Sequence, residues 1–376
     1  MAPSLDEGNS LFNFVVQDGY GVKGMVDLGL LKVPAPYVQP PKERIDKQNS
    51  RMCPLQPIDL SKLDGPEHDR VAEEIARAAS TLGFFQVVNH GMPIELLEKL
   101  KDTAHSFFGQ APEKKAVYRK GASPSPLVKY GTSFVPEKEK ALEWKDYISM
   151  TYTDDVEALQ QWPQECKEVL LEYLKKSVMM VRKLLEVLME NLGVKPDNSK
   201  IDALIGSKMI ISNGTYKSAE HRVRTTSTKS RVSIPVFTMP KLSEKIGPLP
   251  ELVERDGARF RELVFQDYMN NFFSNAHDGK NSLHFAQFHE VSLEKSTLVK
   301  SKDWEVCKTD RERDSVIGAE KVEKVDNEDC IEESISYLPD KALERGISDA
   351  LVLEKVSNVI AAKEKSLSAI LLAHIN

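Results

Sequence analysis

The first half of the chain alternates apolar and polar positions with the spacing of amphipathic helices. Apolar residues recur every three or four positions over 68–82, 93–108 and 164–192, and this spacing predicts three helices. Two short runs rich in β-branched or aromatic residues, 57–60 and 84–88, predict strands. The pattern therefore indicates a mixed region in which helices dominate.

The second half has a different pattern, made of short apolar runs that turn residues separate. Strands are predicted at 208–211, 221–224 and 231–237, and a last helix at 257–277. A β domain needs three or more strands with a buried face to be stable alone. These few strands predict an incomplete β region.

After residue 288 the chain becomes an acidic mixture with weak helical periodicity near 351–373. The 376 residues carry a net charge of −6, and residues 289–376, with 13 Lys or Arg and 19 Asp or Glu, account for all of it. A negative net charge disfavours a non-specific nucleic-acid binder. We interpret 289–376 as a solvated or partly disordered acidic extension of unknown role.

Composition narrows the class of protein further. Apolar residues are 41% and charged residues 29% of the chain, which is ordinary for a globular protein, and no apolar run approaches the ~18 residues of a membrane span. The acidic start lacks the basic region of a secretory signal. The four cysteines are scattered, which is typical of a reducing compartment. We expect a cytoplasmic monomer without membrane or nucleic-acid partners.

Candidate chemistry lies on the two strands predicted at 221–224 and 231–237. Strand alternation places Arg231 and Ser233 on one face of the second strand, and His221 lies on the first. A histidine suits iron, zinc or copper, whereas an arginine fork with a nearby hydroxyl suits a carboxylate. The two strands could therefore direct a metal ligand and a carboxylate clamp into one cavity.

Several segments form a pattern that occurs together in one enzyme family. They are PIDL at 57–60, GFFQVVNHG at 83–91, YKSAEHRV at 216–223, RVS at 231–233 and IGPLP at 246–250. Through these segments the chain resembles the plant iron(II)/2-oxoglutarate-dependent dioxygenases over roughly residues 10–287. Four more segments resemble the feruloyl-CoA ortho-hydroxylase group of coumarin biosynthesis. They are VKG at 22–24, GTSF at 131–134, LEWKDY at 142–147 and AHDGK at 276–280.

The resemblance implies a helical and mixed N-terminal region followed by a double-stranded β-helix, or jelly roll. It implies Fe(II) and 2-oxoglutarate as cofactors, with ascorbate as a candidate accessory, and hydroxylation of a phenolic or an aromatic acyl-CoA such as feruloyl-CoA. By the same resemblance, His221 corresponds to the distal iron ligand, and Arg231 and Ser233 correspond to the residues that bind the far carboxylate of 2-oxoglutarate.

The chain departs from the family pattern at the metal site. None of its eight histidines has a carboxylate two positions later, so the His-x-Asp pair of the family is absent. The block that would carry this pair and several strands, on the order of 70 residues at 8–12 residues per strand, is missing between Ile210 and Ile211. The predicted fold class is α+β, with a helical and mixed region followed by an incomplete jelly-roll remnant.

The sequence divides into four predicted regions. They are an N-terminal arm (1–55), a dioxygenase N-terminal region (56–200), a truncated jelly-roll remnant (201–288) and the acidic extension (289–376). Three interpretations of the sequence remain open. The chain is a dioxygenase family member with impaired catalytic activity, a non-catalytic binding or interaction protein, or an unstable product of an aberrant gene model.

Overall fold

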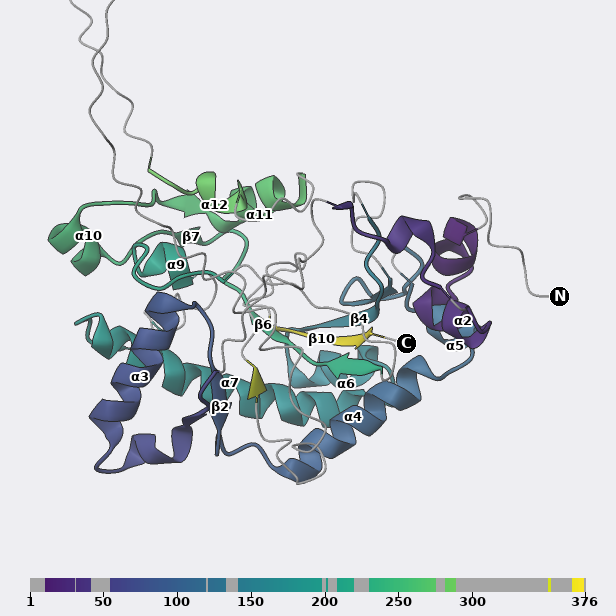
Figure 1. Ribbon diagram of the computed structural model, residues 1–376, viewed down its shortest axis with the longest axis horizontal. Coiled ribbons are helices and arrows are strands. Elements are labelled where there is room, and N and C mark those ends of the chain that lie inside the picture. Colours follow the sequence, from purple (N-terminus) through teal and green to yellow (C-terminus); the bar gives the residue numbers. More distant parts are fainter. Residues whose placement is uncertain are drawn as a thin grey trace, which may run out of the picture.

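The fold is that of a computed structural model, shown as a ribbon in Figure 1. It describes residues 11–30, 32–41, 55–119, 121–132, 141–197, 201, 208–219, 230–274, 281–288, 351–352 and 367–374.

The described helices range from single turns to one of 25 residues. They are η1 (Asn13–Gln17), α2 (Gly21–Asp27), η2 (Ala35–Tyr37), η4 (Leu60–Asp64), α3 (His68–Thr81), α4 (Ile94–Phe108), α5 (Pro112–Ala116), α6 (Asp155–Gln161), α7 (Lys167–Asn191), α9 (Lys208–Ile211), α10 (Pro250–Asp256), α11 (Phe265–Ser274) and α12 (Asn281–His284). The three helices predicted from periodicity are confirmed as α3, α4 and α7. None of the described helices is both long enough and apolar enough to cross a lipid bilayer.

The described strands form three sheets. They are β1 (Ile58–Asp59), β2 (Gln86–Val88), β3 (Val128–Gly131), β4 (Asp146–Tyr152), β5 (Arg231–Ser233), β6 (Val236–Thr238), β7 (Lys245–Ile246), β8 (Leu263–Val264), β9 (Leu351–Val352) and β10 (Leu367–His374). The main sheet has the order β3-β4-β10-β5, and β6 also pairs with β10. The two smaller sheets are β1-β2-β9 and β7-β8. The strands predicted at 57–60 and 84–88 are confirmed as β1 and β2.

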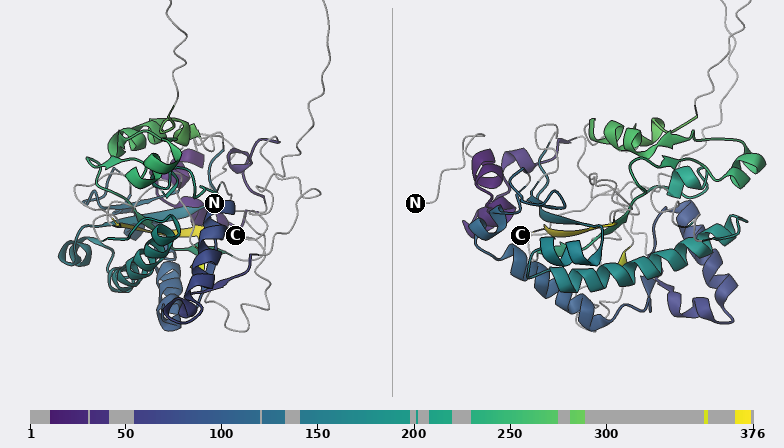
Figure 2. Two further views of the ribbon diagram at one scale, coloured as in Figure 1. Left: turned by 90° about the vertical axis from the view of Figure 1, so that its left-hand side faces the viewer. Right: turned by 180° about the vertical axis from the view of Figure 1, so that it is seen from behind.

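One face of the main sheet lies against α4 and α7 (Figure 2). Ile148 and Met150 of β4 are buried with Leu100 of α4 and Leu170 and Leu174 of α7. On a strand such alternate residues share a face, and on a helix residues four apart do so. The helical periodicity of the first half therefore supplies the layer on which the sheet rests.

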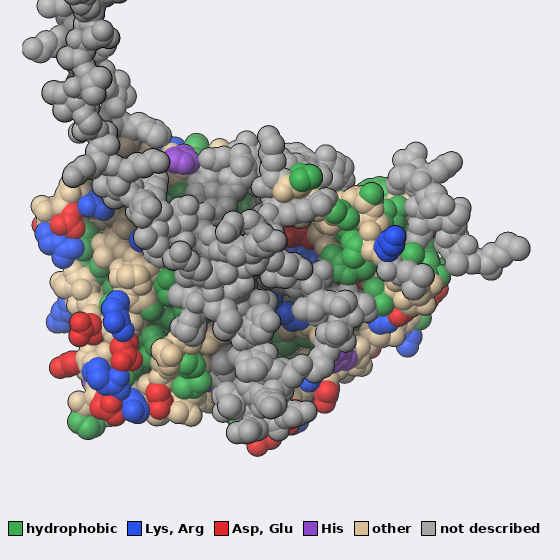
Figure 3. Space-filling model, viewed as in Figure 1, with side chains coloured by type: hydrophobic (Ala, Val, Ile, Leu, Met, Phe, Trp, Pro, Cys, Tyr) green, Lys and Arg blue, Asp and Glu red, His purple; other side chains and the backbone are tan. Residues whose placement is uncertain are grey.

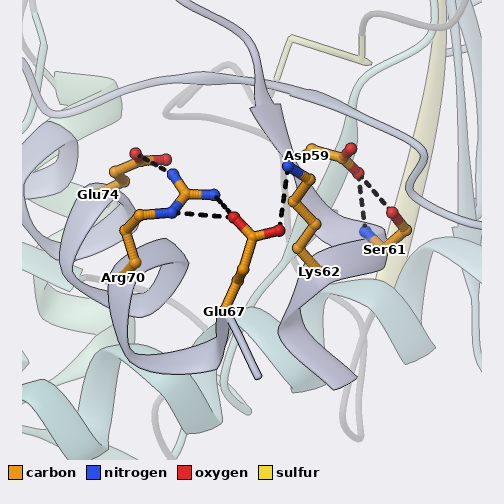
Figure 4. Close-up of polar contacts among 6 residues, drawn as sticks. All are labelled: Asp59, Ser61, Lys62, Glu67, Arg70 and Glu74. Carbon is orange, nitrogen blue, oxygen red and sulfur yellow. Dashed lines mark hydrogen bonds and ion pairs between the residues drawn. The ribbon is translucent and has the colours of Figure 1, made fainter. Parts of the chain in front are cut away.

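A second apolar cluster joins α3 to the C-terminal half of α7. It includes Val71 and Ile75 from α3 and Leu184 and Leu188 from α7. The outer side of α3 is polar, and Arg70 forms ion pairs with Glu67 and Glu74 there (Figure 4). These ion pairs are exposed, and water and dissolved salt weaken them. The position of α3 therefore depends mainly on the apolar contacts of its buried side.

Gly83 follows α3 and has a backbone that other residues rarely adopt, with φ +83°. A Cβ atom there would lie 2.9 Å from the carbonyl oxygen of Lys217 and 2.8 Å from the amide nitrogen of Ala219. The amide of Lys217 in turn donates to the carbonyl of Ala79 at 2.9 Å. Glycine at this position thus lets segment 217–219 lie directly against the end of α3.

Segment 208–211 was predicted as a strand, and this prediction is wrong because the segment forms the single helical turn α9. Ile210 and Ile211 are both buried, but in two different apolar clusters on either side of the turn. Two adjacent apolar residues resemble a buried strand in sequence, whereas here a helical turn distributes them between two cores. The turn ends at Asn213 and Gly214, which both have positive φ.

Two further predictions need correction. The helix predicted at 257–277 begins only at Phe265, after strand β8, because Leu263 pairs with Ile246 of β7. The helical periodicity near 351–373 is also misleading, since this region contributes strands β9 and β10. The strand predicted at 231–237 is confirmed but interrupted, as β5 and β6.

The predicted N-terminal arm contains the short helices η1 and α2. Figure 3 shows hydrophobic side chains over this part of the molecule. Exposed apolar residues are frequent in it: Tyr20, Leu28, Leu30, Val33 and Val38. Their exposure leaves the arm attached mainly through the buried residues of η1 and α2.

Asp146 at the start of β4 fixes the arm to the sheet. Its carboxylate is fully buried and accepts hydrogen bonds from the amides of Val22 at 2.7 Å and Lys23 at 3.0 Å. A Cβ on Gly21, whose φ is +70°, would lie 2.5 Å from both carboxylate oxygens. The segments 22–24 and 142–147, far apart in sequence, therefore meet at one hydrogen-bonded contact.

The pKa of Asp146 makes this contact sensitive to pH. Burial raises its pKa to about 6, although the two amide donors and the charge of Lys115 act in the opposite direction. A carboxyl whose pKa is raised on folding stabilises the fold below its unfolded value of 3.8, and this contribution is lost as the pH rises through 6. Burial of this carboxyl therefore favours the fold most in mild acid, although the two amide hydrogen bonds themselves favour the ionised carboxylate.

We predict that Asp146→Asn removes this pH dependence. Between pH 4 and pH 7 the free energy of unfolding of the unmodified chain should fall by about 1–3 kcal/mol relative to that of the variant, which cannot titrate there. Urea unfolding at both pH values measures the difference. Asp18→Asn, at an exposed position of the same arm, is the control and should follow the unmodified chain. Parallel pH profiles for D146N and the unmodified chain would contradict the prediction.

A second prediction concerns Gly83. Gly83→Ala should destabilise the chain by about 1–3 kcal/mol more than Gly91→Ala in urea unfolding, because it adds a backbone collision to the strain of positive φ. Gly91 is a matched control, since its φ is +79° and a Cβ added there would meet no atom within 4 Å. Equal losses for the two variants would show that segment 217–219 does not rest on Gly83.

Candidate functional site

Arg231 and Ser233 lie on β5 and share one face of it. Val232 between them packs on the opposite face, against the apolar cluster of α4 and α7. The two candidate residues therefore face away from the helical layer. The hydroxyl of Tyr173 on α7 donates to the carbonyl of Ile234 at 3.1 Å and holds the end of the strand.

Backbone pairing fixes β5 from its other side. Arg231 is the register partner of His374, and Ser233 is the partner of Leu372, both in β10. On β10's far side, Leu372 pairs with Tyr147 of β4. The backbone of Arg231 and Ser233 is thus positioned by its pairing with β10.

The hydroxyl oxygen of Ser233 is buried and has no hydrogen-bond partner among the described residues. A buried polar group without a partner costs about 1–3 kcal/mol, so such groups are uncommon unless they serve a ligand. Arg231 beside it is half-buried and carries a planar fork of donors. This arrangement is chemically suited to a carboxylate, which would accept from both side chains.

His221, the candidate metal ligand, lies outside the described residues. The segment that leads toward it is held firmly, since Tyr216 donates its hydroxyl to the carbonyl of Leu188 at 2.7 Å and its amide to the hydroxyl of Ser212 at 2.9 Å. Burial raises the pKa of Tyr216, so it stays a neutral donor. That His221 and Arg231 face the same side stays a prediction.

Sequence reasoning missed a small apolar pocket close to the junction of Ile210 and Ile211. Its lining residues come from the end of α7 and from the segment after α9: Leu185, Leu188, Met189, Leu192, Ile211, Ser212 and Tyr216. The only sequence signal nearby is the Asn213-Gly214 turn. The hydroxyl groups of Ser212 and Tyr216 are engaged in the hydrogen bonds above, so the pocket offers apolar surface and no chemistry of its own.

Fe(II) requires several donors at one point, and the described residues do not supply them. No group of three or more His, Cys, Asp and Glu side chains among them is arranged to hold a metal ion. His90 accepts from the amide of Met92 at 3.1 Å in a turn, and burial raises the pKa of the Cys166 thiol to about 12, which disfavours the thiolate. Because the full sequence also lacks His-x-Asp and His-x-Glu, the residues present do not fit an iron centre of the family type.

Family models match two consecutive parts of the chain. One, described as the N-terminal region of a non-haem dioxygenase in morphine synthesis, matches residues 55–165. The other, described as the 2OG-Fe(II) oxygenase superfamily, matches residues 173–240.

Similar proteins are plant hydroxylases. Scopoletin 8-hydroxylase of Arabidopsis thaliana is 50% identical over 355 residues, which cover 76% of this chain and 99% of that protein. A bi-functional coumaroyl CoA and feruloyl CoA ortho-hydroxylase of Ipomoea batatas is 37% identical over 346 residues, which cover 73% of this chain and 95% of that protein. A crystal structure of JOX2 in complex with 2OG, Fe and JA matches with a TM-score of 0.56 at 21% identity, covering 71% of this chain and 97% of that one.

The coverage values reveal a gap in this chain relative to its relatives. The alignment with scopoletin 8-hydroxylase is 355 residues long, but 76% of 376 residues is only about 286 residues of this chain. About 70 positions of the relative therefore have no counterpart here, as the missing block between Ile210 and Ile211 predicts. Alignments that span nearly the whole length of these relatives, at 50% and 37% identity, show that the chain belongs to the plant 2-oxoglutarate- and Fe(II)-dependent dioxygenase family, in which its relatives include hydroxylases of the coumarin pathway.

Proposed function

We propose that this chain is a dioxygenase family member that has lost its iron centre and keeps a carboxylate-binding remnant in Arg231 and Ser233. Its inherited reaction is the hydroxylation of a phenolic or an aromatic acyl-CoA such as feruloyl-CoA, by analogy with the names of its relatives. The jelly roll is incomplete in this proposal, and the protein acts as a cytoplasmic monomer on small molecules. The observation that carries the proposal is the lack of any His-x-Asp or His-x-Glu in the full sequence.

The cofactors of the family are Fe(II) and 2-oxoglutarate. A four-ligand zinc site contributes about 10–16 kcal/mol, or roughly 3–4 kcal/mol for each ligand. His221 alone would therefore hold a divalent ion with a dissociation constant of about 1 mM, and Fe(II) ranks low in the affinity order. Stoichiometric iron is therefore not expected in this chain.

Binding of a carboxylate does not need the metal. A charge-assisted hydrogen bond contributes about 1.5–3 kcal/mol, so an arginine fork with the buried Ser233 hydroxyl supports a dissociation constant of about 1 mM or weaker. The proposed activity is thus weak recognition of a dicarboxylate without turnover.

A binding or interaction module is the second candidate. Its supporting observation is the helical half, where a family model matches residues 55–165 and α7 packs with α3 in one buried cluster and with α4 in another. Iron content after anaerobic reconstitution separates a working dioxygenase from either non-catalytic reading.

We predict that the chain releases no CO₂ from 2-oxoglutarate above the buffer rate, with feruloyl-CoA or another phenolic. A chimera with the corresponding block of scopoletin 8-hydroxylase between Ile210 and Ile211 should gain iron and 2-oxoglutarate consumption, because it restores the donor set. The matched control is the same chimera with the histidine of its His-x-Asp pair changed to alanine. Product formed by the unmodified chain in step with 2-oxoglutarate use would overturn the proposal.

A further prediction tests the clamp in the presence of EDTA. Ligand-observed NMR should detect weak binding of 2-oxoglutarate to the unmodified chain and at least about tenfold weaker binding to Arg231→Ala, because the fork is lost. Ser233→Ala should show a smaller loss. Arg70→Ala, which removes an exposed arginine of α3, is the control. Equal binding by R231A and R70A would remove Arg231 from the site.

A further inference from the structure

Strand β10 lies in the interior of the main sheet although it comes from the far end of the chain. It pairs antiparallel with β4 along most of its length, from Leu367 opposite Tyr152 to Ala373 opposite Asp146. On its other side it pairs with β5 near its end and with β6 near its start. Figure 1 shows this strand, in yellow, between β4 and β6.

The connection of β5 and β6 to the sheet runs through β10. Among the described strands, β5 and β6 pair with β10 and with no other strand, and β4 has only β3 on its opposite side. Without β10 the sheet would separate into a β3–β4 pair and two isolated short strands. Two-stranded pairs are marginally stable at best, so β10 is required for the sheet.

The origin of β10 sets it apart from its neighbours. The segment 367–374 lies beyond the family match, which ends at residue 240, and beyond the resemblance, which ends near residue 287. β4 precedes the junction of Ile210 and Ile211, whereas β5 follows it. If the roughly 70 positions without a counterpart lie at that junction, as the sequence predicts, they fall between the two strands that β10 joins.

We propose that residues 367–374 form a substitute strand: the gap between β4 and the β5–β6 side is a strand-acceptor site, and the chain fills it with its own C-terminal segment. Backbone hydrogen bonds do not depend on side-chain identity, so an unrelated segment can satisfy them if it is extended and apolar. The run Ala369-Ile370-Leu371-Leu372-Ala373 has that composition. A second tail segment, β9, likewise adds to the edge of the β1–β2 pair.

The proposal goes beyond the lost iron centre and does not depend on it. It rests on strand pairing and on the missing block, and it can fail while the chain still lacks turnover. Its consequence for the site is that the backbone of Arg231 and Ser233 is held in place by the tail.

The test uses the full chain with Leu372→Pro. Leu372 pairs with Tyr147 on one side and Ser233 on the other, so a proline there removes a ladder hydrogen bond whichever way its amide points. The control is Leu372→Val, which keeps the amide. We expect L372P to melt about 6 °C or more below L372V and to bind more of a hydrophobic dye.

Hydrogen exchange and a peptide added in trans complete the experiment. In L372P the amides of 146–152 and 231–238 should exchange at least about tenfold faster than in L372V, whereas the exchange rates of the α3 amides should not change. A synthetic peptide of residues 365–376, added to L372P, should restore the protection. A scrambled peptide of the same composition should not. Equal melting and exchange of L372P and L372V would overturn the proposal. So would a dimeric unmodified chain whose protection falls on dilution, since the strand would then come from a second copy.

If L372P does not accumulate as soluble protein, hydrogen exchange of the unmodified chain still tests the proposal. Slow exchange of the amides of 367–374 in a monomer supports the substitute strand. Exchange at the rate of an unstructured chain refutes it.

Discussion

Unpaired backbone groups at strand edges are the constraint on which the rest of this structure depends. A strand in a buried sheet needs hydrogen-bond partners for its amides and carbonyls, and leaving them unpaired costs far more than a typical hydrogen bond contributes. β4 precedes the proposed junction of Ile210 and Ile211, β5 and β6 follow it, and β10 provides the ladder that joins them. The helical layer of α4 and α7 supports the sheet, but it cannot satisfy these groups.

Under the proposed loss of a block, the same constraint explains why a sheet can form again whereas the metal site cannot. A strand can be replaced by another extended segment because its backbone groups are the same in every residue. An iron site depends on particular side chains at particular spacings, and a substitute strand does not bring them. In the proposed reading, Arg231 and Ser233 are present because they lie on β5, after the proposed junction, whereas the sequence contains no His-x-Asp pair.

Asp146 links the arm to the sheet in a different way, through two amide donors at one buried carboxylate. Gly21 permits the approach, since any side chain there would overlap the carboxylate. Burial without a full counter-charge raises the pKa of Asp146 and leaves this contact dependent on protonation. A segment whose exposed side includes Leu28, Leu30 and Val33 is thus positioned by a few polar contacts, those at Asp146 among them, and by a small apolar cluster.

The sequence by itself determined the three long helices, the β1 and β2 strands, the Arg-x-Ser pattern and the lack of a His-x-Asp pair. These are local properties, because a helix satisfies its hydrogen bonds within a few residues and a motif is a matter of spacing. Only the tertiary structure decided that 208–211 is a helical turn, that 367–374 is a strand, and that Asp146 lies under Val22 and Lys23. In each case the residues that contact the segment lie more than a hundred positions away or belong to two separate apolar clusters. The sequence of a short apolar run does not indicate which distant strand or cluster will bury it.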